Sequence, residues 1–243
     1  MRSGGSSEYA LVPVKSIEQQ SLLTVHRVRG ELVQARTALI NQLRGLLLEF
    51  GVAMPKGRYQ FRAHVGRWLI DERIPSLARE VLSELNARIG SLDHDILGYD
   101  RRLEAIARAS EPVQRIMAIG GVGPISATAM VASIADAKLF RNGRELAAWL
   151  GLVPRQYSTG GKPRLGRITK RGDVYLRTLL VHGARAALTM MARRNNRLAQ
   201  WARALIARRG FKKACVALAA KNARTIWALL AKGEAYRKPE ARA

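Results

Sequence analysis

A pair of hydroxyl side chains among glycines and cations is the part of this sequence best suited to chemistry. Ser158 and Thr159 precede two glycines within the segment 151–173. The same segment carries six basic residues: Arg155, Lys162, Arg164, Arg167, Lys170 and Arg171. Such surroundings stabilise a phosphate and lower the cost of ionising a neighbouring hydroxyl. No histidine stands nearby as a base, so the residue types alone favour a loop that grips phosphates over a reacting nucleophile.

A second glycine-rich run has a different use. Gly121 and Gly123 lie in the run 119–124, between two short segments of helical pattern. In a helix-hairpin-helix, glycines allow the tight turn, and the N–H groups that open the next helix face a phosphate. Ser126 and Thr128 could add hydroxyl contacts. An ordinary glycine-rich helix connection is the alternative, and the basic chain around the run favours phosphate binding.

The charge of the chain points to a polyanionic partner. The 243 residues contain 42 Lys and Arg against 18 Asp and Glu, for a net charge of +24. Residues 151–243 hold 22 of those cations and only three of the acids, so we expect the partner on the last third. Neutralised phosphates release counterions, which favours nucleic acid, although ribosomal proteins and proteins that bind anionic membranes share this composition.

Several classes of site and location are disfavoured. Cys215 is the only cysteine, which rules out an intrachain disulfide and predicts a small buried side chain. The four histidines are scattered without metal-ligand spacing, so no metal site is expected in this chain. No apolar stretch suggests a membrane span, and the first residues lack the apolar core of a signal peptide. We therefore expect a bacterial cytoplasmic protein associated with the nucleoid.

Two long amphipathic helices are expected in the first half. Ser16 and Gln19 fit a capping box that opens a helix running to Gly51. After Pro75, apolar residues recur at spacings of four and three: Leu77, Val81, Leu85, Ile89, Leu92, Ile96, Tyr99, Leu103 and Ile106. This heptad-like stripe predicts a coiled-coil arm. An arm that joins two copies of the chain and a hairpin within one copy are equally compatible with it.

The acidic residues of this arm are expected on its solvated surface. Asp93, Asp95, Asp100 and Glu104 alternate with arginines, as on an exposed helix face. We do not expect them to be metal ligands.

The sequence as a whole predicts a mainly α protein. After the arm, a second region is expected to contain an α-helical DNA-binding domain with the helix-hairpin-helix-like turn, and a small hairpin inside 151–170. Its helices are expected at about 112–118, 124–136, 143–150, 173–194, 197–209 and 212–231. The expected divisions are a leader (1–14), the helical arm (15–110), the DNA-binding domain (112–232) and a tail (233–243).

The order of motifs closely resembles one transposase family. The runs that carry the resemblance are Ala118–Pro124, Phe140–Pro154, Tyr157–Lys162 and Ile168–Asp173, and the whole match extends from about Val12 to residue 231. They are similar to the DEDD transposases of insertion sequences, which act as serine recombinases guided by a bridge RNA. The resemblance implies DNA transposition and recombination, with DNA and a guide RNA as partners.

The same resemblance implies roles for particular residues. Ser158 matches the serine that attacks a DNA phosphodiester, with Thr159 as the less favoured neighbour. The cations from Lys162 to Arg171 would hold the scissile and flanking phosphates. Family members also carry an N-terminal RNase-H-like (RuvC-like) domain whose four acidic residues bind Mg²⁺.

The chain departs from the family pattern at its start. Only about a dozen residues precede the arm, so we expect the RuvC-like domain to be missing and this truncated chain to be inactive alone. The alternative is a non-enzymatic helix-hairpin-helix protein that binds DNA or RNA, for which Ser158 has no role. A structural RNA binder of ribosomal type is a third hypothesis.

Overall fold

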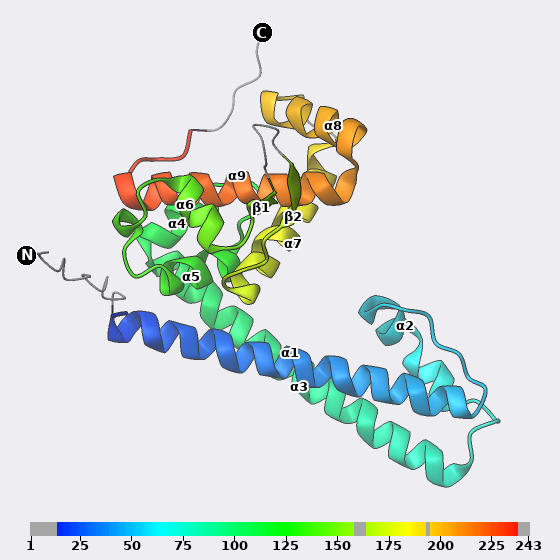
Figure 1. Ribbon diagram of the computed structural model, residues 1–243. Helices are drawn as coiled ribbons and strands as arrows, with labels where there is room; N and C mark the ends of the chain where they lie inside the picture. Colours follow the sequence, from blue (N-terminus) through cyan, green and yellow to red (C-terminus); the bar gives the residue numbers. More distant parts are fainter. Residues whose placement is uncertain (1–13, 158–163, 193–194, 238–243) are drawn as a thin grey trace, which may run out of the picture. The chain divides into compact units, whose positions relative to one another are not determined.

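Helices build most of the chain, which confirms the mainly α fold class. The computed structural model (Figure 1) describes residues 14–157, 164–192 and 195–237. Within those residues there is one two-stranded antiparallel sheet. The elements are α1 (Ile17–Glu49), α2 (Arg58–Leu69), α3 (Ser76–Ala109), α4 (Glu111–Met117), α5 (Pro124–Ser133), a 3-10 turn η1 (Ala137–Leu139), α6 (Gly143–Trp149), β1 (Pro154–Gln156), β2 (Leu165–Ile168), α7 (Val174–Met191), α8 (Arg197–Arg209) and α9 (Phe211–Lys232).

The chain divides into two compact units. Residues 24–103 form one, which we call the arm unit, and it contains most of α1, all of α2 and most of α3. The described residues before Thr24 and after Leu103 form the other, which we call the C-terminal unit.

The capping box at the start of α1 is confirmed. The Gln19 backbone N–H donates to Ser16 Oγ at 3.2 Å, and the Ser16 N–H donates to Gln19 Oε1 at 3.1 Å. The Gln19 side chain has a second role within the C-terminal unit. Its Nε2 donates to the carbonyl oxygens of Val131 and Ile134, at 3.1 and 3.0 Å, beside the end of α5. These two bonds anchor the first turn of α1 to that unit.

The arm unit is built round one apolar cluster. α1, α2 and α3 contribute buried side chains to it, and α1 and α3 run side by side (Figure 1). On α3 the buried positions repeat every seven residues, as in a coiled coil. These residues are Leu82, Ile89, Ile96 and Leu103.

Part of the expected apolar stripe was wrong. Leu77, Val81 and Ile106 are 74%, 46% and 36% exposed, whereas Leu82, absent from the expected stripe, is buried. The burial of Leu82 is explained by α2, since Leu82 packs in the same cluster as Phe61 of that helix. Packing against two neighbours sets which residues of α3 are buried.

The prediction that the acidic residues of the arm lie on its solvated surface was also wrong in part. Asp93 and Asp100 do not lie on a solvated face. Asp93 Oδ1 accepts from Arg36 Nη1 at 2.8 Å, and both side chains are only 9% exposed. Asp100 pairs with Arg29, whose side chain is 16% exposed. These ion pairs join α1 to α3, because a partly buried carboxylate needs a charged partner.

Helix α9 is the centre of the C-terminal unit. It contacts α4, α6, α7 and α8, and its buried face includes Leu218, Ile226 and Leu229. By length and composition, α9 is the one helix in the described residues that could cross a membrane. Its packing in the core accounts for that apolar composition. Cys215 lies buried on the same helix, and burial raises the pKa of its thiol.

Candidate nucleic-acid interface

The expected hairpin inside 151–170 is present. β1 and β2 are antiparallel, with Pro154 opposite Ile168 and Gln156 opposite Leu165. One more bond, from the Tyr157 N–H to the Arg164 carbonyl at 2.8 Å, continues the ladder toward the tip. Every residue of the two strands is exposed except Ile168, which is partly buried. A short hairpin with so little buried surface must be held at its base.

Two glycines lock that base by close backbone contact. A Cβ on Gly151 would fall 2.1 Å from the Arg171 carbonyl oxygen, and one on Gly172 would fall 1.9 Å from that of Trp149. Both glycines have positive φ, of 69° and 104°. The Lys170 N–H donates to the Gly151 carbonyl at 3.1 Å across the same contact. Gly151 and Gly172 therefore serve backbone packing, which is a role that the sequence alone did not predict.

The first turns of helix α7 hold the base of the hairpin through hydrogen bonds. Asp173 caps this helix, with its Oδ1 accepting from the Leu176 N–H at 2.9 Å. The Arg177 guanidinium, 9% exposed, donates from Nη1 to the Leu150 carbonyl at 3.1 Å and to that of Asp173 at 3.5 Å. Arg177 thus links the residues at both ends of the hairpin. Sequence reasoning missed it, because nothing local distinguishes this arginine from exposed ones.

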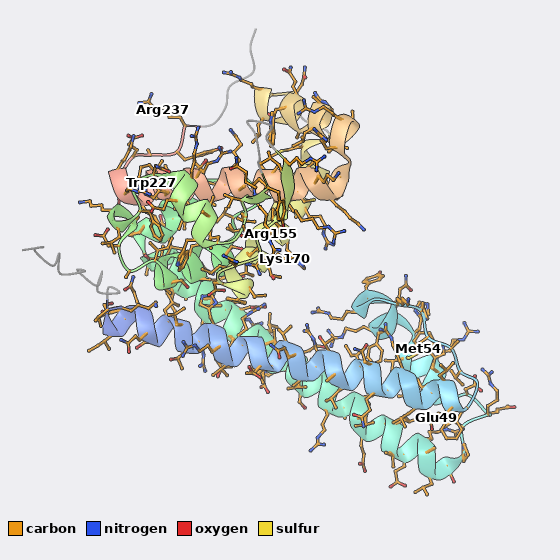
Figure 2. The ribbon with its side chains drawn as sticks, viewed as in Figure 1. Glu49, Met54, Arg155, Lys170, Trp227 and Arg237 are labelled. Carbon is orange, nitrogen blue, oxygen red and sulfur yellow. The ribbon has the colours of Figure 1, made fainter. Side chains whose placement is uncertain are left out.

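The hairpin and its base gather five of the predicted phosphate-binding cations. All five are exposed, and none forms an ion pair within the part of the chain that the structure describes. The nearest acid in the sequence, Asp173, is engaged as a helix cap. Figure 2 shows two of them, Arg155 and Lys170, close together on the C-terminal unit. The five are Arg155, Arg164, Arg167, Lys170 and Arg171.

Three predicted site residues belong to the segment between Tyr157 and Arg164. Ser158, Thr159 and Lys162 lie outside the described residues.

The second glycine turn joins α4 to α5 and packs against two other helices. Gly121 has φ of 89°, and a Cβ there would lie 2.5 Å from the Gly183 carbonyl oxygen of α7. The Asn222 side chain of α9 donates to the Gly120 carbonyl at 3.1 Å. Gly123 is exposed at the start of α5. Close packing on α7 explains why position 121 is a glycine.

The hydroxyls after this turn face inward. Ser126 is 8% exposed, and Thr128 is fully buried with its Oγ1 donating to the Pro124 carbonyl at 2.7 Å. Of the four residues singled out near this turn, only Gly123 is exposed. The two predicted regions therefore differ. The residues predicted at the turn are mostly buried, whereas the cations predicted on the hairpin are exposed to solvent.

The described residues offer no ligand set for a metal ion. No three His, Cys, Asp or Glu side chains gather within the described ranges. His26 is buried in the arm, 2% exposed, and burial together with the nearby Arg29 lowers its pKa to about 4.

Comparisons with known proteins point to one family. Residues 113–204 match the model of the Transposase IS116/IS110/IS902 family. The chain is 49% identical over 229 residues to a "probable family 20 transposase" of Pseudomonas aeruginosa. The aligned residues cover 93% of this chain and 68% of that protein. It is 45% identical over 226 residues to the transposase for insertion sequence element IS1111A of Coxiella burnetii, covering 92% and 62%.

A third relative is more distant. The transposase for insertion sequence element IS1328 of Yersinia enterocolitica is 35% identical over 227 residues, covering 93% of this chain and 68% of that protein. The chain thus spans about two thirds of the length of these relatives. The residues that match the family model include the glycine turn at 119–124 and the segment 151–173 that contains the hairpin. With the extent of these identities, the chain belongs to the IS116/IS110/IS902 family of transposases.

Proposed function

We propose that this chain binds DNA during transposition and that its hairpin presents Ser158 to a DNA phosphodiester. The observation that carries the proposal is the pair of strands β1 and β2, which are exposed, carry basic side chains and are fixed at their base by Gly151 and Gly172. Arginines that lack acidic partners bind phosphate oxygens well. A rigid base would place the tip reproducibly against such a phosphate.

The proposed step is a transesterification. The Ser158 oxygen forms a bond to phosphorus, and the bond from phosphorus to one deoxyribose oxygen breaks. The serine proton passes to solvent water, and the departing deoxyribose oxygen takes a proton from solvent, so that one phosphodiester is exchanged for another. Arg155, Arg164 and Arg167 would neutralise the charge that builds on the phosphate oxygens. Thr159 is the alternative nucleophile.

Mg²⁺ belongs to this proposal only by resemblance to the family. The described residues contain no cluster of three possible ligands, so they do not fit a Mg²⁺ site of their own.

The nucleophile is tested by trapping the covalent adduct. The chain is incubated with DNA that bears the ends of its element, guide RNA, Mg²⁺ and a RuvC-like domain supplied as a separate polypeptide, then resolved on a denaturing gel. We expect an adduct that Ser158→Ala abolishes and Thr159→Ala leaves in place. Adduct formation by Ser158→Ala would contradict the assignment.

Two partners belong to the proposal as well. The chain would bind a guide RNA and associate with a second copy through the arm. Exposed apolar side chains of the arm unit, among them Leu77 and Val81 of α3, are available for that contact. The non-enzymatic alternative predicts DNA or RNA binding that survives Ser158→Ala together with an absence of any adduct.

A further inference from the structure

A pocket lies where the start of α6 meets α9, within the C-terminal unit. Its volume is about 400 Å³. The groups around it are of three kinds: a tryptophan, two arginines and small polar or apolar residues. They are Asn142, Gly143, Arg144, Arg224, Trp227 and Ala228.

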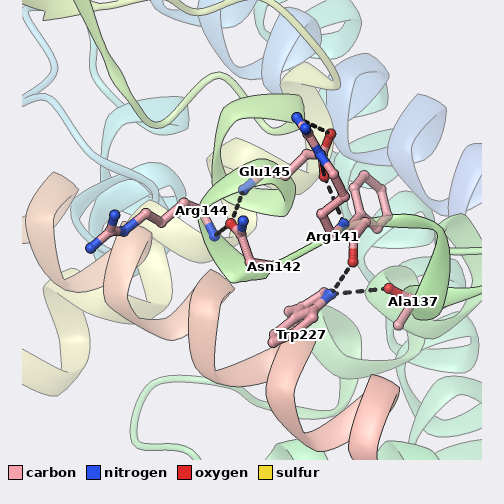
Figure 3. Close-up of polar contacts among 7 residues, drawn as sticks. Ala137, Arg141, Asn142, Arg144, Glu145 and Trp227 are labelled. Carbon is pink, nitrogen blue, oxygen red and sulfur yellow. Dashed lines mark hydrogen bonds and ion pairs between the residues drawn. The ribbon is translucent and has the colours of Figure 1, made fainter.

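The pocket is rigidly built from the α6 side. Asn142 caps the helix, and its Oδ1 accepts from the N–H groups of Arg144 and Glu145 at 2.9 and 3.1 Å (Figure 3). Gly143 lies directly against α9, because a Cβ there would fall 2.8 Å from the Arg224 carbonyl oxygen. No other residue type fits at position 143 without moving the two helices apart.

Two hydrogen bonds fix the orientation of the Trp227 side chain. Trp227 Nε1 donates to the carbonyl oxygens of Ala137 and Phe140, at 3.0 and 2.9 Å (Figure 3). These bonds occupy the only polar group of the indole. What Trp227 offers the pocket is therefore an apolar aromatic surface held in one orientation.

The two arginines have guanidinium N–H groups that can bind an anion. Arg224 Nε donates to the Ala220 carbonyl at 3.3 Å, which leaves the two Nη atoms of that side chain for a ligand. Arg144 and Arg224 are exposed, and neither has an acidic partner among the described side chains. The adjacent acid, Glu145, is already engaged. The Arg141 backbone N–H donates to it at 2.7 Å and the Arg141 guanidinium at 3.3 Å, and these contacts lower the pKa of Glu145.

We propose that this pocket binds an unpaired nucleotide, with its base against Trp227 and its phosphate at Arg144 and Arg224. Aromatic rings and arginines together are the means by which proteins bind unpaired bases. A base inside a duplex is stacked on its neighbours and cannot reach the ring. An acidic peptide would satisfy the arginines and leave the indole surface unused.

The position of the pocket suits a strand that also reaches the hairpin. α6 begins at the pocket and ends at Trp149, against which the base of the hairpin packs. Seven helical residues span about 10 Å, which is roughly three nucleotides of a stacked strand. The inference rests on the proposed function to the extent that both need nucleic acid on the C-terminal unit.

The experiment uses the full chain and a photoreactive probe. A single-stranded DNA oligomer carrying iodouracil, its duplex form and an RNA oligomer of the same sequence are each irradiated with the protein. The crosslinked residue is then identified by mass spectrometry. We expect a crosslink at Trp227 with unpaired strands and none with the duplex, and the stronger of the DNA and RNA crosslinks identifies the source of the nucleotide.

Two double variants distinguish binding in the pocket from attraction by the net charge of the chain. Arg144→Gln with Arg224→Gln removes both pocket cations and should weaken single-strand binding about tenfold. The matched control is Lys138→Gln with Lys232→Gln, which removes the same charge outside the pocket and should have little effect. Both pairs are exposed, so we expect normal thermal unfolding.

Three results would overturn the inference. They are equal weakening by the two double variants, a Trp227 crosslink as strong with the duplex as with single strands, and competition by polyglutamate as strong as by the oligomer. Failure of the hairpin proposal gives a different result. In that case Arg164→Gln with Arg167→Gln would leave duplex binding unchanged while the Trp227 crosslink persists.

Discussion

At the residue scale, Gly151 and Gly172 make the strongest case for a structural role in the hairpin. Each would place a Cβ about 2 Å from a carbonyl oxygen, and both have positive φ. We expect Gly151→Ala to lower the free energy of unfolding by about 3 kcal/mol or more, because steric overlap adds to backbone strain. Urea unfolding followed by circular dichroism measures this loss.

The chain offers a matched control for that substitution. Gly233 also has positive φ, of 68°, but the atom nearest to the position that a Cβ would take there is the end of the Arg115 side chain, at an ordinary contact distance of 3.6 Å. Gly233→Ala should therefore cost only the backbone strain, about 1 kcal/mol. Equal losses at positions 151 and 233 would show that close packing contributes nothing at the base of the hairpin.

His26 gives the arm a dependence on pH. Burial and the charge of Arg29 lower its pKa from 6.5 to about 4, so the folded chain holds this imidazole neutral. Between those values the unfolded chain binds more protons, and stability falls as the pH falls. We expect a loss of about 2 kcal/mol from His26 between pH 7 and pH 5, measured by urea unfolding at each pH.

Two variants isolate this effect. His26→Leu should flatten the pH dependence, whereas His94→Gln should leave it as in the wild type, since His94 is exposed. A wild-type slope retained in His26→Leu would assign the pH dependence to other groups.

At the element scale, Asp93 connects all three helices of the arm unit. Its two oxygens pair with Arg36 of α1 at 2.8 Å and Arg62 of α2 at 3.0 Å. We expect Asp93→Asn to destabilise the unit by about 3 kcal/mol, because Arg36 would remain buried without its partner. Thermal unfolding of the full chain, followed by circular dichroism at low salt, would detect the loss.

An exposed ion pair on the same helix serves as the reference. Glu104 and Arg108 are 3.7 Å apart and largely exposed. Such pairs contribute little to stability, so Glu104→Gln should leave the unfolding temperature almost unchanged. If Asp93→Asn also left the unfolding temperature almost unchanged, the ion pairs of Asp93 would not contribute to the stability of the arm unit.

The elements could largely be predicted from the sequence, and their contacts could not. The Ser16 and Gln19 capping box and the heptad spacing of α3 are local signals, so α1 and α3 were expected close to their observed bounds. Burial of Leu82 depends on α2, and the ion pair of Asp93 depends on a residue 57 positions away. Contacts of this kind leave no local pattern in the sequence.

The same distinction holds for the candidate interface. The hairpin and its cations follow from residue types and spacing within one segment. Arg177 and the pocket at Trp227 were missed, because each joins residues distant in the chain. The inward position of Ser126 depends likewise on the packing of α5 in the C-terminal unit.

At the scale of the whole molecule, the concentration of cations after residue 150 should govern binding to DNA. The affinity of such a protein falls linearly with the logarithm of salt concentration, with a slope set by the number of phosphates neutralised. We expect Arg164→Gln with Arg167→Gln to reduce that slope by about two, because each side chain contacts one phosphate. Fluorescence anisotropy with duplex DNA at a series of salt concentrations measures it.

The arm supplies the control for net charge. Arg88 and Arg101 are exposed on α3, and Arg88→Gln with Arg101→Gln removes the same two charges from the other unit. Long-range attraction is screened within about 10 Å at moderate salt, so distant charges change the slope far less than residues in contact with phosphate. Equal slopes for the two double variants would mean that total charge, and not the hairpin, determines how this chain holds DNA.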